Sequence, residues 1–487
     1  MNYPFEDSVA ARDFSRRPTE GCGVCAVYNH PQAAELVQLG LFALQHRGQE
    51  SAGIASYNED EEHMSLHKDT GLVSDVFTPK KMKRLQGRVA IGHVRYSTAG
   101  GGMACNAQPL RANYRGGHIA VAHNGNLTNA EELASFLEAN GAIFQSTADS
   151  ELLIHLVAQN RDSNFKNALC QSLKRLKGAY SMVILHDNEV YAVRDPFGFR
   201  PLVLGKLSEN GHDAWVVASE TCALDIIGAT FMREVAPGEA VHLYEGGIEK
   251  FQALETREPQ RFCVFEYIYY SRPDSVIANK TIYNVRLRLG EELAKEHPAE
   301  ADVVVPVPDS SNPAAIGYAR ASGIPMENGL IRSHYIGRTF ISPEQKERDR
   351  KVYMKFNPVR EVLANKRVVL VDDSVVRGTT ARKIVRMVRE AGAREVHFRI
   401  TAPPWKHPCY YGIDTPTEEL LIANTHTPRQ MAEHFGVDSI GFISMDALMR
   451  AVPPTLSYCT SCFTGRYPDG RPRFAQGKHQ HVRPGTR

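Results

Sequence analysis

Continuous apolar runs alternate with helical patterns between about residues 280 and 450, and this alternation constrains the fold more than any other feature. The run DVVVPVP precedes the small-residue segment NPAAIGYARASG, and RVVLVDD precedes TARKIVRMVREAG, which ends on Gly392 as a helix C-cap would. EVHFRITAP and ELLIAN continue the alternation. Because continuous apolar strands that feed helices are covered on both faces, the sequence predicts a parallel, doubly wound sheet.

The preceding part of the chain, from about residue 22 to 255, has a different texture. Short β-rich runs such as HIAVAHNG, AYSMVIL and AWVVAS alternate with polar turns, and helical patterns such as AEELASFLEAN intervene. This mixture predicts an α+β layered domain with antiparallel sheets. A polar stretch at about residues 254 to 262, LETREPQRF, is the expected boundary, and 487 residues suit two domains of roughly 200 residues each.

Composition and charge exclude several classes of protein. The formal net charge is +2 with no long basic run, so nucleic-acid binding is not expected. No stretch approaches the ~20 apolar residues of a membrane span, and the first 21 residues lack the apolar core of a secretory signal. A cytoplasmic protein is therefore expected. The tail from residue 466 to 487, rich in Pro, Gly, His and Arg, is expected to be loosely ordered.

The strand RVVLV ends in Asp372 and Asp373, at the strand end where α/β sheets bind ligands. Two carboxylates there can bind ribose hydroxyls or Mg²⁺. Gly378 lets the backbone approach closely, and the following helix N-terminus attracts phosphate. An acidic strand end with a Thr N-cap is the simpler reading of DD or GTT alone. The complete loop comprises Ser374, Val375, Val376, Arg377, Gly378, Thr379 and Thr380. This whole string resembles the phosphoribosylpyrophosphate (PRPP) loop of type I phosphoribosyltransferases.

A second strand end carries Asp309, Ser310 and Ser311, which by the same geometry are candidates to hold a pyrophosphate group, although PDSS is also an ordinary turn. The long segment HYIGRTFISPEQKERDRKVYMKFNPVR lies between the two loops. A solvated basic surface is one interpretation of it. A lid over an anionic substrate, bearing Arg338 and Lys351, explains its charge better.

Cys22 lies in GCGVCAVYNH and is followed by several motifs that suit amide hydrolysis. A lone cysteine is more often buried than catalytic. Arg95, however, is suited to pair with a substrate carboxylate, and Asp149 with a substrate ammonium. Asn124 and Gly125 offer an amide and an N–H to an oxyanion. A thiolate nucleophile, an oxyanion hole and anchors for an amino acid together indicate hydrolysis of an amide side chain.

The chain resembles the glutamine phosphoribosylpyrophosphate amidotransferase family over about residues 22 to 465. The motifs that carry the resemblance occur in the family's order: CGV, QHRGQESAGI, HVRYST, HNGNL, RDPFGFRPL, YYSRPDS, GRTFI and VDDSVVRGTT. The resemblance implies an N-terminal-nucleophile αββα glutaminase domain at residues 22–255 and a type I phosphoribosyltransferase domain at 256–465. Glutamine would be hydrolysed and its ammonia transferred to C1 of PRPP, the first committed step of purine synthesis.

In that family the nucleophilic cysteine begins the mature chain and its free α-amine serves as the base. An α-amine titrates near about 8, which suits proton transfer at neutral pH. Residues 1–21 are therefore expected to be a propeptide removed after Gly21, and the competing interpretation is an arm that stays attached. Two positions depart from the family pattern. Gly21 replaces a frequent acidic residue, and Cys25 replaces a frequent Phe and is interpreted as a small buried hydrophobe.

Among nine irregularly spaced cysteines, Cys459 and Cys462 form a C-x-x-C, while Cys263 and Cys409 are distant from it. Spacing alone leaves zinc, an iron–sulfur cluster, redox chemistry or four unrelated thiols open. One branch of the family has both a propeptide and a [4Fe–4S] cluster, and these four cysteines match its ligands. The resemblance therefore implies one cluster per subunit, with zinc bound by four cysteines as the alternative.

The resemblance also implies the substrate contacts. Glutamine would be bound by Arg95, Thr98, Gly125 and Asp149, with Cys22, Asn124 and Gly125 catalytic. PRPP would be bound by Asp372, Asp373, residues 374–380, Arg338 and Lys351, and one Mg²⁺ by Ser310, Asp372 and Asp373. A homotetramer inhibited by purine nucleotides is expected.

Two rival functions differ in testable features. A glutaminase-coupled enzyme that makes glucosamine 6-phosphate would carry sugar-isomerase domains and lack VDDSVVRGTT. A regulatory nucleotide-binding module without transferase activity is the rival from another class, and the intact PDSS, lid and DDS set argues against it.

Overall fold

The computed structural model describes residues 21–96, 104–209, 211–333 and 355–472, which separate into two compact units. The main break falls between Phe262 and Cys263. Two later segments, 409–414 and 467–472, belong to the first unit, and the other described residues of 263–466 form the second. Each unit is described by itself below.

Two antiparallel sheets form the centre of the first unit. One has the strand order β11-β9-β10-β1-β4-β2-β3 among the described residues, and the other β13-β12-β8-β7-β6-β5. The strands of the first sheet are β1 (Gly21–Tyr28), β2 (Ser51–Asn58), β3 (His63–Thr70), β4 (Val89–Tyr96), β9 (Val203–Glu209), β10 (His212–Ala218) and β11 (Thr230–Glu234). Those of the second are β5 (Leu110–Tyr114), β6 (Gly117–Leu127), β7 (Gly178–His186), β8 (Glu189–Arg194), β12 (Glu239–Tyr244) and β13 (Gly247–Gln252).

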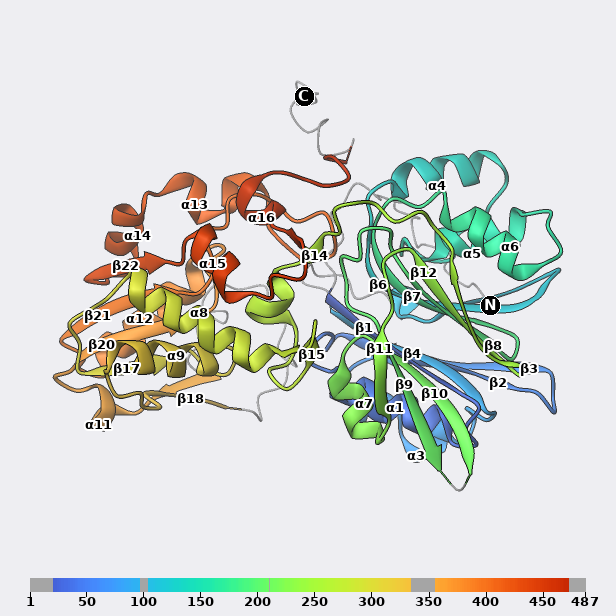
Figure 1. Cartoon of the computed structure of the whole chain (residues 1–487), viewed down its shortest axis with the longest axis horizontal. Helices are drawn as coiled ribbons and strands as arrows, with labels where there is room; N and C mark the ends of the chain where they lie inside the picture. The colour runs from blue at the N-terminus through green and yellow to red at the C-terminus, as the bar shows by residue number, and fades with distance from the viewer. Residues whose placement is uncertain (1–20, 97–103, 210, 334–354, 473–487) are drawn as a thin grey trace, which may run out of the picture. The chain divides into compact units, whose positions relative to one another are not determined.

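Helices cover the outer faces of both sheets, so this unit has four layers (Figure 1). The helices α1 (Ala33–Ala43) and α7 (Thr221–Ile227) pack on the first sheet, and α4 (Ala130–Ala139), α5 (Glu151–Gln159) and α6 (Phe165–Leu173) on the second. The short helices α2 (Val73–Val76) and α3 (Pro79–Met82) lie beside the first sheet. In α4, Leu133 and Leu137 are buried one turn apart, as an amphipathic helix requires. The αββα prediction is confirmed.

A continuous core lies between the two sheets. Alternate residues of β1, such as Val24 and Ala26, meet alternate residues of β6 and β7, such as Ala122 and Val183. Because side chains alternate across a strand, the residues between them point to the helices instead. This alternation also fixes the direction of every polar residue at the strand ends.

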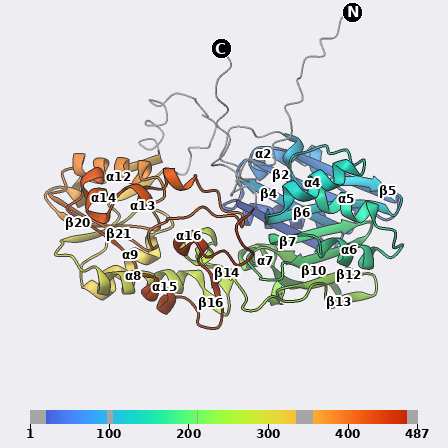
Figure 2. The same ribbon diagram turned by 90° about the horizontal axis from the view of Figure 1, so that it is seen from above.

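A parallel sheet of order β17-β20-β21-β22 forms the centre of the second unit, which confirms the doubly wound prediction. Its strands are β17 (Val303–Pro306), β20 (Arg367–Asp372), β21 (Glu395–Ile400) and β22 (Ser439–Phe442). The helices are α8 (Ile282–Glu296), α9 (Asn312–Ser322), α12 (Thr379–Glu390), α14 (Pro428–Phe435) and α15 (Met445–Ala451), with the short α11 (Arg360–Leu363), α13 (Ile422–Thr425) and α16 (Ser461–Thr464). Figure 2 shows α12 and α14 on one side of the sheet and α8 and α15 on the other.

Three two-stranded ladders complete this part of the chain: β14 (Phe262–Cys263) with β23 (Tyr458–Cys459), β15 (Val276–Ile277) with β16 (Lys280–Thr281), and β18 (Leu330–Arg332) with β19 (Phe356–Pro358). The expectation that ELLIAN continues the strand alternation is wrong. Glu418–Leu420 form a 3₁₀ turn, and α13 follows directly. The apolar residues of this run that are buried, Leu421 and Ile422, fix a loop to the core and do not form a strand. The fourth strand is instead β22, the less apolar SIGF.

Candidate functional site

Cys22 lies at the start of β1 and is fully buried. On the same strand, Val24 and Ala26 belong to the core between the two sheets, whereas Cys25 and Val27 pack under the helices. Because alternate residues share a face, the Cys22 side chain points into the space between the sheets. The thiol is therefore held by a rigid central strand and faces the second sheet.

Asn124 lies on the facing side of the second sheet. Its neighbours at alternate positions of β6, Ala120 and Ala122, belong to the core between the sheets, so the Asn124 amide points toward the first sheet. Asn124 is 3% exposed, and its Nδ2 has no hydrogen-bond partner among the described residues. Burying such a donor without a partner costs roughly 1–3 kcal/mol. This donor is therefore a candidate to bind a ligand oxygen.

The strand β4 ties these two sides together. Arg95 lies directly opposite Cys22 in the β1–β4 ladder. Two residues earlier, the His93 Nε2 lies 3.0 Å from the main-chain carbonyl of His123, the residue before Asn124. Burial lowers the pKa of His93 to about 3, so the imidazole is neutral and Nε2 donates to that carbonyl. The structure thus brings Cys22, Arg95 and Asn124 to one end of the space between the sheets.

Gly125 has a backbone conformation that a side chain would not allow. Its φ is +151°, and a Cβ atom would lie 2.0 Å from the carbonyl oxygen of Ala179 on the adjacent β7. Glycine is therefore required where β6 passes the predicted oxyanion position.

Asp149 lies in the turn before α5, beside the end of β6, and accepts hydrogen bonds from His123 Nδ1 (3.2 Å) and from the N–H of Leu127 (2.8 Å). Burial favours its protonated form, but the charge and hydrogen bond of His123 outweigh burial, and the charge of Arg95 adds to them. The pKa of Asp149 is therefore held below its usual range. An ionised carboxylate near Arg95 suits the two charged ends of an amino acid.

Sequence reasoning missed two buried polar groups that support this end of the sheets. The Gln108 side chain accepts the N–H of His123 at 2.8 Å. Arg47 and Glu220, whose side chains are fully buried, form an ion pair beneath β1. Nε2 of His46 lies 2.7 Å from the same Glu220 oxygen. The motif QHRGQESAGI contains His46 and Arg47, so the sequence signalled that segment but not its partner.

Two further predictions have different outcomes. Cys25 is fully buried under α1, and burial raises the pKa of its thiol to about 12, which confirms its interpretation as a buried apolar residue. Thr98 lies outside the described residues.

The two predicted loops of the second unit meet at the carboxyl edge of the parallel sheet. The strands β17 and β20 are adjacent and parallel, so Ser310 and Asp373 follow the same edge. Ser310 Oγ donates to Asp373 Oδ2 at 2.6 Å, and Ser374 Oγ donates to Asp373 Oδ1 at 2.6 Å. Asp372 Oδ1 accepts the N–H of Asp373 at 2.9 Å.

The electrostatics of this pair favour a bound cation. Burial, with the charge of Asp373 in addition, raises the pKa of Asp372 well above its usual range. Burial also raises the pKa of Asp373, while Ser310 and Ser374 act in the opposite direction. Two adjacent carboxylates, Asp372 half-buried and Asp373 buried, are stabilised in their ionised form by a divalent cation.

The loop between them and α12 has the geometry expected of a phosphate cradle. Gly378 is the N-cap of α12 with φ +75°, and a Cβ there would lie 2.7 Å from the Phe435 ring. Thr379 and Thr380 form the first turn, whose N–H groups point toward the loop. Val375 is buried, and Val376 accepts the N–H of Ile422 at 3.0 Å. Arg338 and Lys351 lie outside the described residues.

Three of the four cysteines predicted as cluster ligands lie in the second unit, and all three are buried. The ladder of β14 and β23 brings Cys263 and Cys459 onto paired strands, and Cys462 lies in α16 directly after. Cys409 begins the segment 409–414 of the first unit. Within the described ranges, no group of three or more His, Cys, Asp and Glu residues is arranged to hold a metal ion.

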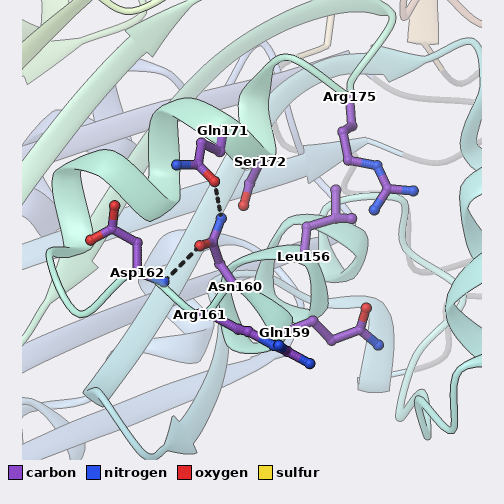
Figure 3. Close-up of a pocket in the computed structure, with 8 residues that line it drawn as sticks. All are labelled: Leu156, Gln159, Asn160, Arg161, Asp162, Gln171, Ser172 and Arg175. Atoms are coloured by element: carbon purple, nitrogen blue, oxygen red, sulfur yellow. Dashed lines mark hydrogen bonds between the residues drawn. The ribbon is translucent and has the colours of Figure 1, made fainter.

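An open pocket of about 660 Å³ lies between α5 and α6 and contains no residue predicted for catalysis (Figure 3). Within it, Asn160 Nδ2 donates to Gln171 Oε1 at 3.0 Å, so part of its lining is already satisfied internally. The pocket is lined by Leu156, Gln159, Asn160, Arg161, Asp162, Gln171, Ser172 and Arg175. The hydroxyl of its one serine, Ser172, donates to the carbonyl of Ala168 at 2.7 Å, and no buried donor of the lining is left without a partner.

Comparisons with known proteins agree with the two halves of this description. The chain matches the family model of a glutamine amidotransferase domain over residues 93–225 and that of a phosphoribosyl transferase domain over residues 278–412. The fold and these matches define a two-domain, glutamine-dependent transferase.

Relatives that match nearly the whole of this chain define the family more closely. The amidophosphoribosyltransferase 1 of Arabidopsis thaliana chloroplasts is 50% identical over 93% of this chain and 79% of its own length. The amidophosphoribosyltransferase of Bacillus subtilis is 47% identical over 92% of this chain and 94% of its own length. The chain belongs to the amidophosphoribosyltransferase family. It is an enzyme, and that identity implies a role in purine biosynthesis.

Two solved structures have the same fold. One, described as the allosteric regulatory enzyme of purine biosynthesis, has a TM-score of 0.87 and 46% identity, covering 92% of this chain and 97% of that one. The other is the glutamine PRPP amidotransferase of Bacillus subtilis in complex with ADP and GMP. Its TM-score is 0.86 at 45% identity, covering 92% and 98% of the two chains. In the described part of this chain, no helix has the length and apolar character of a membrane span.

Proposed function

We propose that Cys22 attacks the side-chain amide of glutamine and that the released ammonia displaces pyrophosphate from C1 of PRPP. The products are glutamate, pyrophosphate and 5-phosphoribosylamine. The observation that carries the first half is the orphaned Nδ2 of buried Asn124, which faces the sheet that bears Cys22. In this role Asn124 and the N–H of Gly125 stabilise the oxyanion that forms when the thiolate adds to the carbonyl.

The amino-acid end of glutamine has two candidate anchors. Arg95 would pair with the α-carboxylate and Asp149 with the α-ammonium, with Thr98 as a further contact. The lowered pKa of Asp149 supports this role because the carboxylate stays ionised at neutral pH. With its α-carboxylate and α-ammonium bound in this way, glutamine would extend its side-chain amide toward Cys22.

Cys22 needs a base, and we propose that its own α-amine supplies it after residues 1–21 are removed. An α-amine titrates near about 8 and is close to the thiol by its covalent attachment. N-terminal sequencing of the fully active enzyme tests this proposal. A first residue of Cys22 supports it, whereas Met1 retained in fully active protein would refute it.

In the second half of the reaction, Asp372 and Asp373 would bind the ribose hydroxyls and one Mg²⁺, with Ser310 as a further magnesium ligand. Two carboxylates with waters and substrate phosphates are the usual ligands of Mg²⁺, so the site needs no third carboxylate. Bound Mg²⁺ would neutralise charge on the pyrophosphate leaving group. Residues 374–380 would hold the 5-phosphate at the N-terminus of α12, and Arg338 and Lys351 would exclude water.

We also propose one [4Fe–4S] cluster per subunit, bound by Cys263, Cys409, Cys459 and Cys462. The burial of three of these thiols and the pairing of β14 with β23 support it. The cluster would be structural, since neither half of the reaction transfers electrons. Zinc bound by the same cysteines remains the alternative, and iron and sulfide analysis of anaerobically purified protein distinguishes the two.

A relative crystallised with nucleotides supports a proposal about regulation. The structure from Bacillus subtilis was determined with ADP and GMP. We propose that purine nucleotides inhibit this enzyme too, and that it is a homotetramer acting in the cytoplasm.

The test of the transferase assignment is Asp373→Ala. This variant should lose PRPP-dependent pyrophosphate release with either glutamine or ammonia, while glutamine hydrolysis persists. Asp438→Ala is a matched control in the same sheet, because Asp438 binds Arg389 and the N–H of Val396 and lies at the opposite end of its strands. Retained transferase activity in Asp373→Ala would refute the assignment of Asp373.

A further inference from the structure

The segment 409–414 contacts the residues proposed to bind the oxyanion, although the chain enters and leaves it from the second unit. Asn126 Nδ2 donates to the main-chain carbonyl of Tyr410 at 2.7 Å. Asn126 shares its strand face with Asn124, two residues away on β6. One end of the oxyanion strand is therefore tied to Tyr410.

Gly412 makes the closest approach. A Cβ atom at Gly412 would lie 3.0 Å from the carbonyl carbon of Gly125 and 3.1 Å from its Cα. The φ of Gly412 is +95°, a conformation that side chains rarely adopt. The main chain of this segment thus packs directly on the main chain of the glycine that offers its N–H to the oxyanion.

Arg200 holds the segment in this place. Its Nε and Nη2 donate to the carbonyl of Tyr411 at 3.1 and 2.8 Å, and Arg200 is 1% exposed. Phe199 stacks on the Tyr411 ring at 4.3 Å between centroids. The carbonyl of Arg200 in turn accepts the hydroxyl of Ser181, which lies opposite Asn124 in the β6–β7 ladder.

These contacts form a closed arrangement around the oxyanion residues. Asn126 is fixed by Tyr410, Gly125 by Gly412, and the strand next to Asn124 by Arg200 through Ser181. Catalysis by an oxyanion hole depends on donors held within a few tenths of an ångström, because the gain arises only at the position that the developing charge occupies.

We propose that Arg200 and the segment 409–414 are positioning elements for the oxyanion site, and that they set the rate of glutamine hydrolysis without binding glutamine. This inference rests on the proposed role of Asn124 and Gly125. It extends that role to a guanidinium and a glycine outside the proposed set of glutamine contacts. Arg200 is a positioning residue in this account, and not a catalytic one.

The test compares Arg200→Gln and Gly412→Ala with the wild-type enzyme. The kcat of glutamine hydrolysis should fall at least about tenfold, a fraction of the roughly 100- to 1000-fold that loss of an oxyanion donor costs. The KM for glutamine and the ammonia-dependent synthesis should be unchanged. Inhibition by glutamate γ-semialdehyde should weaken by the same factor as kcat, because the thiolate of Cys22 adds to this aldehyde and its oxygen becomes the oxyanion.

Two additional variants make the comparison specific. Arg200→Lys retains one cationic donor toward the Tyr411 carbonyl and should recover part of the lost kcat. Arg399→Gln is the matched control, because Arg399 is also buried and donates to main-chain carbonyls, those of His297 and Pro298, in the second unit. It should lower stability and leave glutamine hydrolysis unchanged.

Three outcomes would overturn the positioning role: a wild-type kcat in both variants, a raised KM at unchanged kcat, or an equal fall of glutamine- and ammonia-dependent rates. The failure of the underlying assignment is separate. If Asn124→Ala hydrolyses glutamine normally, the oxyanion site itself is misassigned. If Asn124→Ala is slow while Arg200→Gln and Gly412→Ala are normal, only the positioning role is wrong.

Discussion

Replacing Asn124 by alanine removes the donor that the structure leaves without a partner. Because Nδ2 makes no hydrogen bond with the described residues, the substitution breaks no intramolecular bond of that group. The free energy of unfolding should therefore not fall, because the substitution also relieves the roughly 1–3 kcal/mol cost of burying that donor without a partner. Activity should respond very differently, because the donor acts where charge develops.

We expect the kcat of glutamine hydrolysis to fall about 100- to 1000-fold, equivalent to about 2.7–4 kcal/mol of transition-state stabilisation. The KM for glutamine should remain near its original value, because the oxyanion position is not that of the ground-state carbonyl. The assay measures glutamate release, with ammonia-dependent pyrophosphate release as an internal control that should not change.

Asn129→Ala provides the opposite signature. Asn129 Nδ2 donates to the carbonyl of Arg175 at 2.9 Å, and its Oδ1 accepts the N–H of Lys177 at 3.0 Å. Its loss should reduce stability and leave kcat unchanged. A kcat for Asn124→Ala close to that of the wild type, or a parallel loss of ammonia-dependent activity, would refute the reasoning.

Three further predictions concern the other groups. The raised pKa of Asp372 means that its ionisation destabilises the metal-free protein, so this contribution to stability is present at low pH and is lost as pH rises through the folded-state pKa. Thermal unfolding should show that Asp372→Asn removes this pH dependence together with the stabilisation by Mg²⁺, whereas an unchanged response to Mg²⁺ would contradict the assignment. Cys459→Ser should lose bound iron and visible absorbance, and equal iron content in variant and wild type would exclude this ligand. Cys25 packs under α1, where burial raises the pKa of its thiol to about 12, whereas Cys22 faces the proposed glutamine site. Mass spectrometry after brief iodoacetamide treatment should therefore find Cys22 alkylated and Cys25 intact, and the reverse pattern would contradict the roles given to them.

The parallel half of the fold was predictable because its signals are local. An apolar strand ending in Asp372 and Asp373, then a glycine and a helix, defines one βα turn, and the structure has that turn. The same reasoning misassigned ELLIAN, since a short apolar run has no periodicity that separates a strand from a buried loop. The strand β22 was missed because Ser439–Phe442 is short and contains a glycine.

The polar end of the glutaminase sheets was only partly predictable. The motifs named Cys22, Arg95, Asn124 and Asp149, and the alternation along the strands explains how Cys22 and Asn124 come to face each other. The motifs gave no indication that His123 lowers the pKa of Asp149 against the effect of burial. That contact joins a strand to a turn distant in the sequence.

The role of the segment 409–414 had no local sequence signal at all. Arg200 and Asn126 bind the main-chain carbonyls of Tyr411 and Tyr410, and a carbonyl belongs to every residue. The return of this segment to the first unit is likewise a tertiary event that composition cannot register. Contacts to main-chain atoms are therefore the part of a site that is hardest to predict from a single sequence.

The central claim is that one chain hydrolyses glutamine at Cys22 and uses the ammonia at a separate PRPP site. The most direct measurement is PRPP-dependent pyrophosphate release by Cys22→Ala, with glutamine and then with ammonia as the nitrogen source. The account predicts no release with glutamine and a wild-type rate with ammonia. Glutamine-dependent release by Cys22→Ala, or loss of the ammonia-dependent rate, would contradict it.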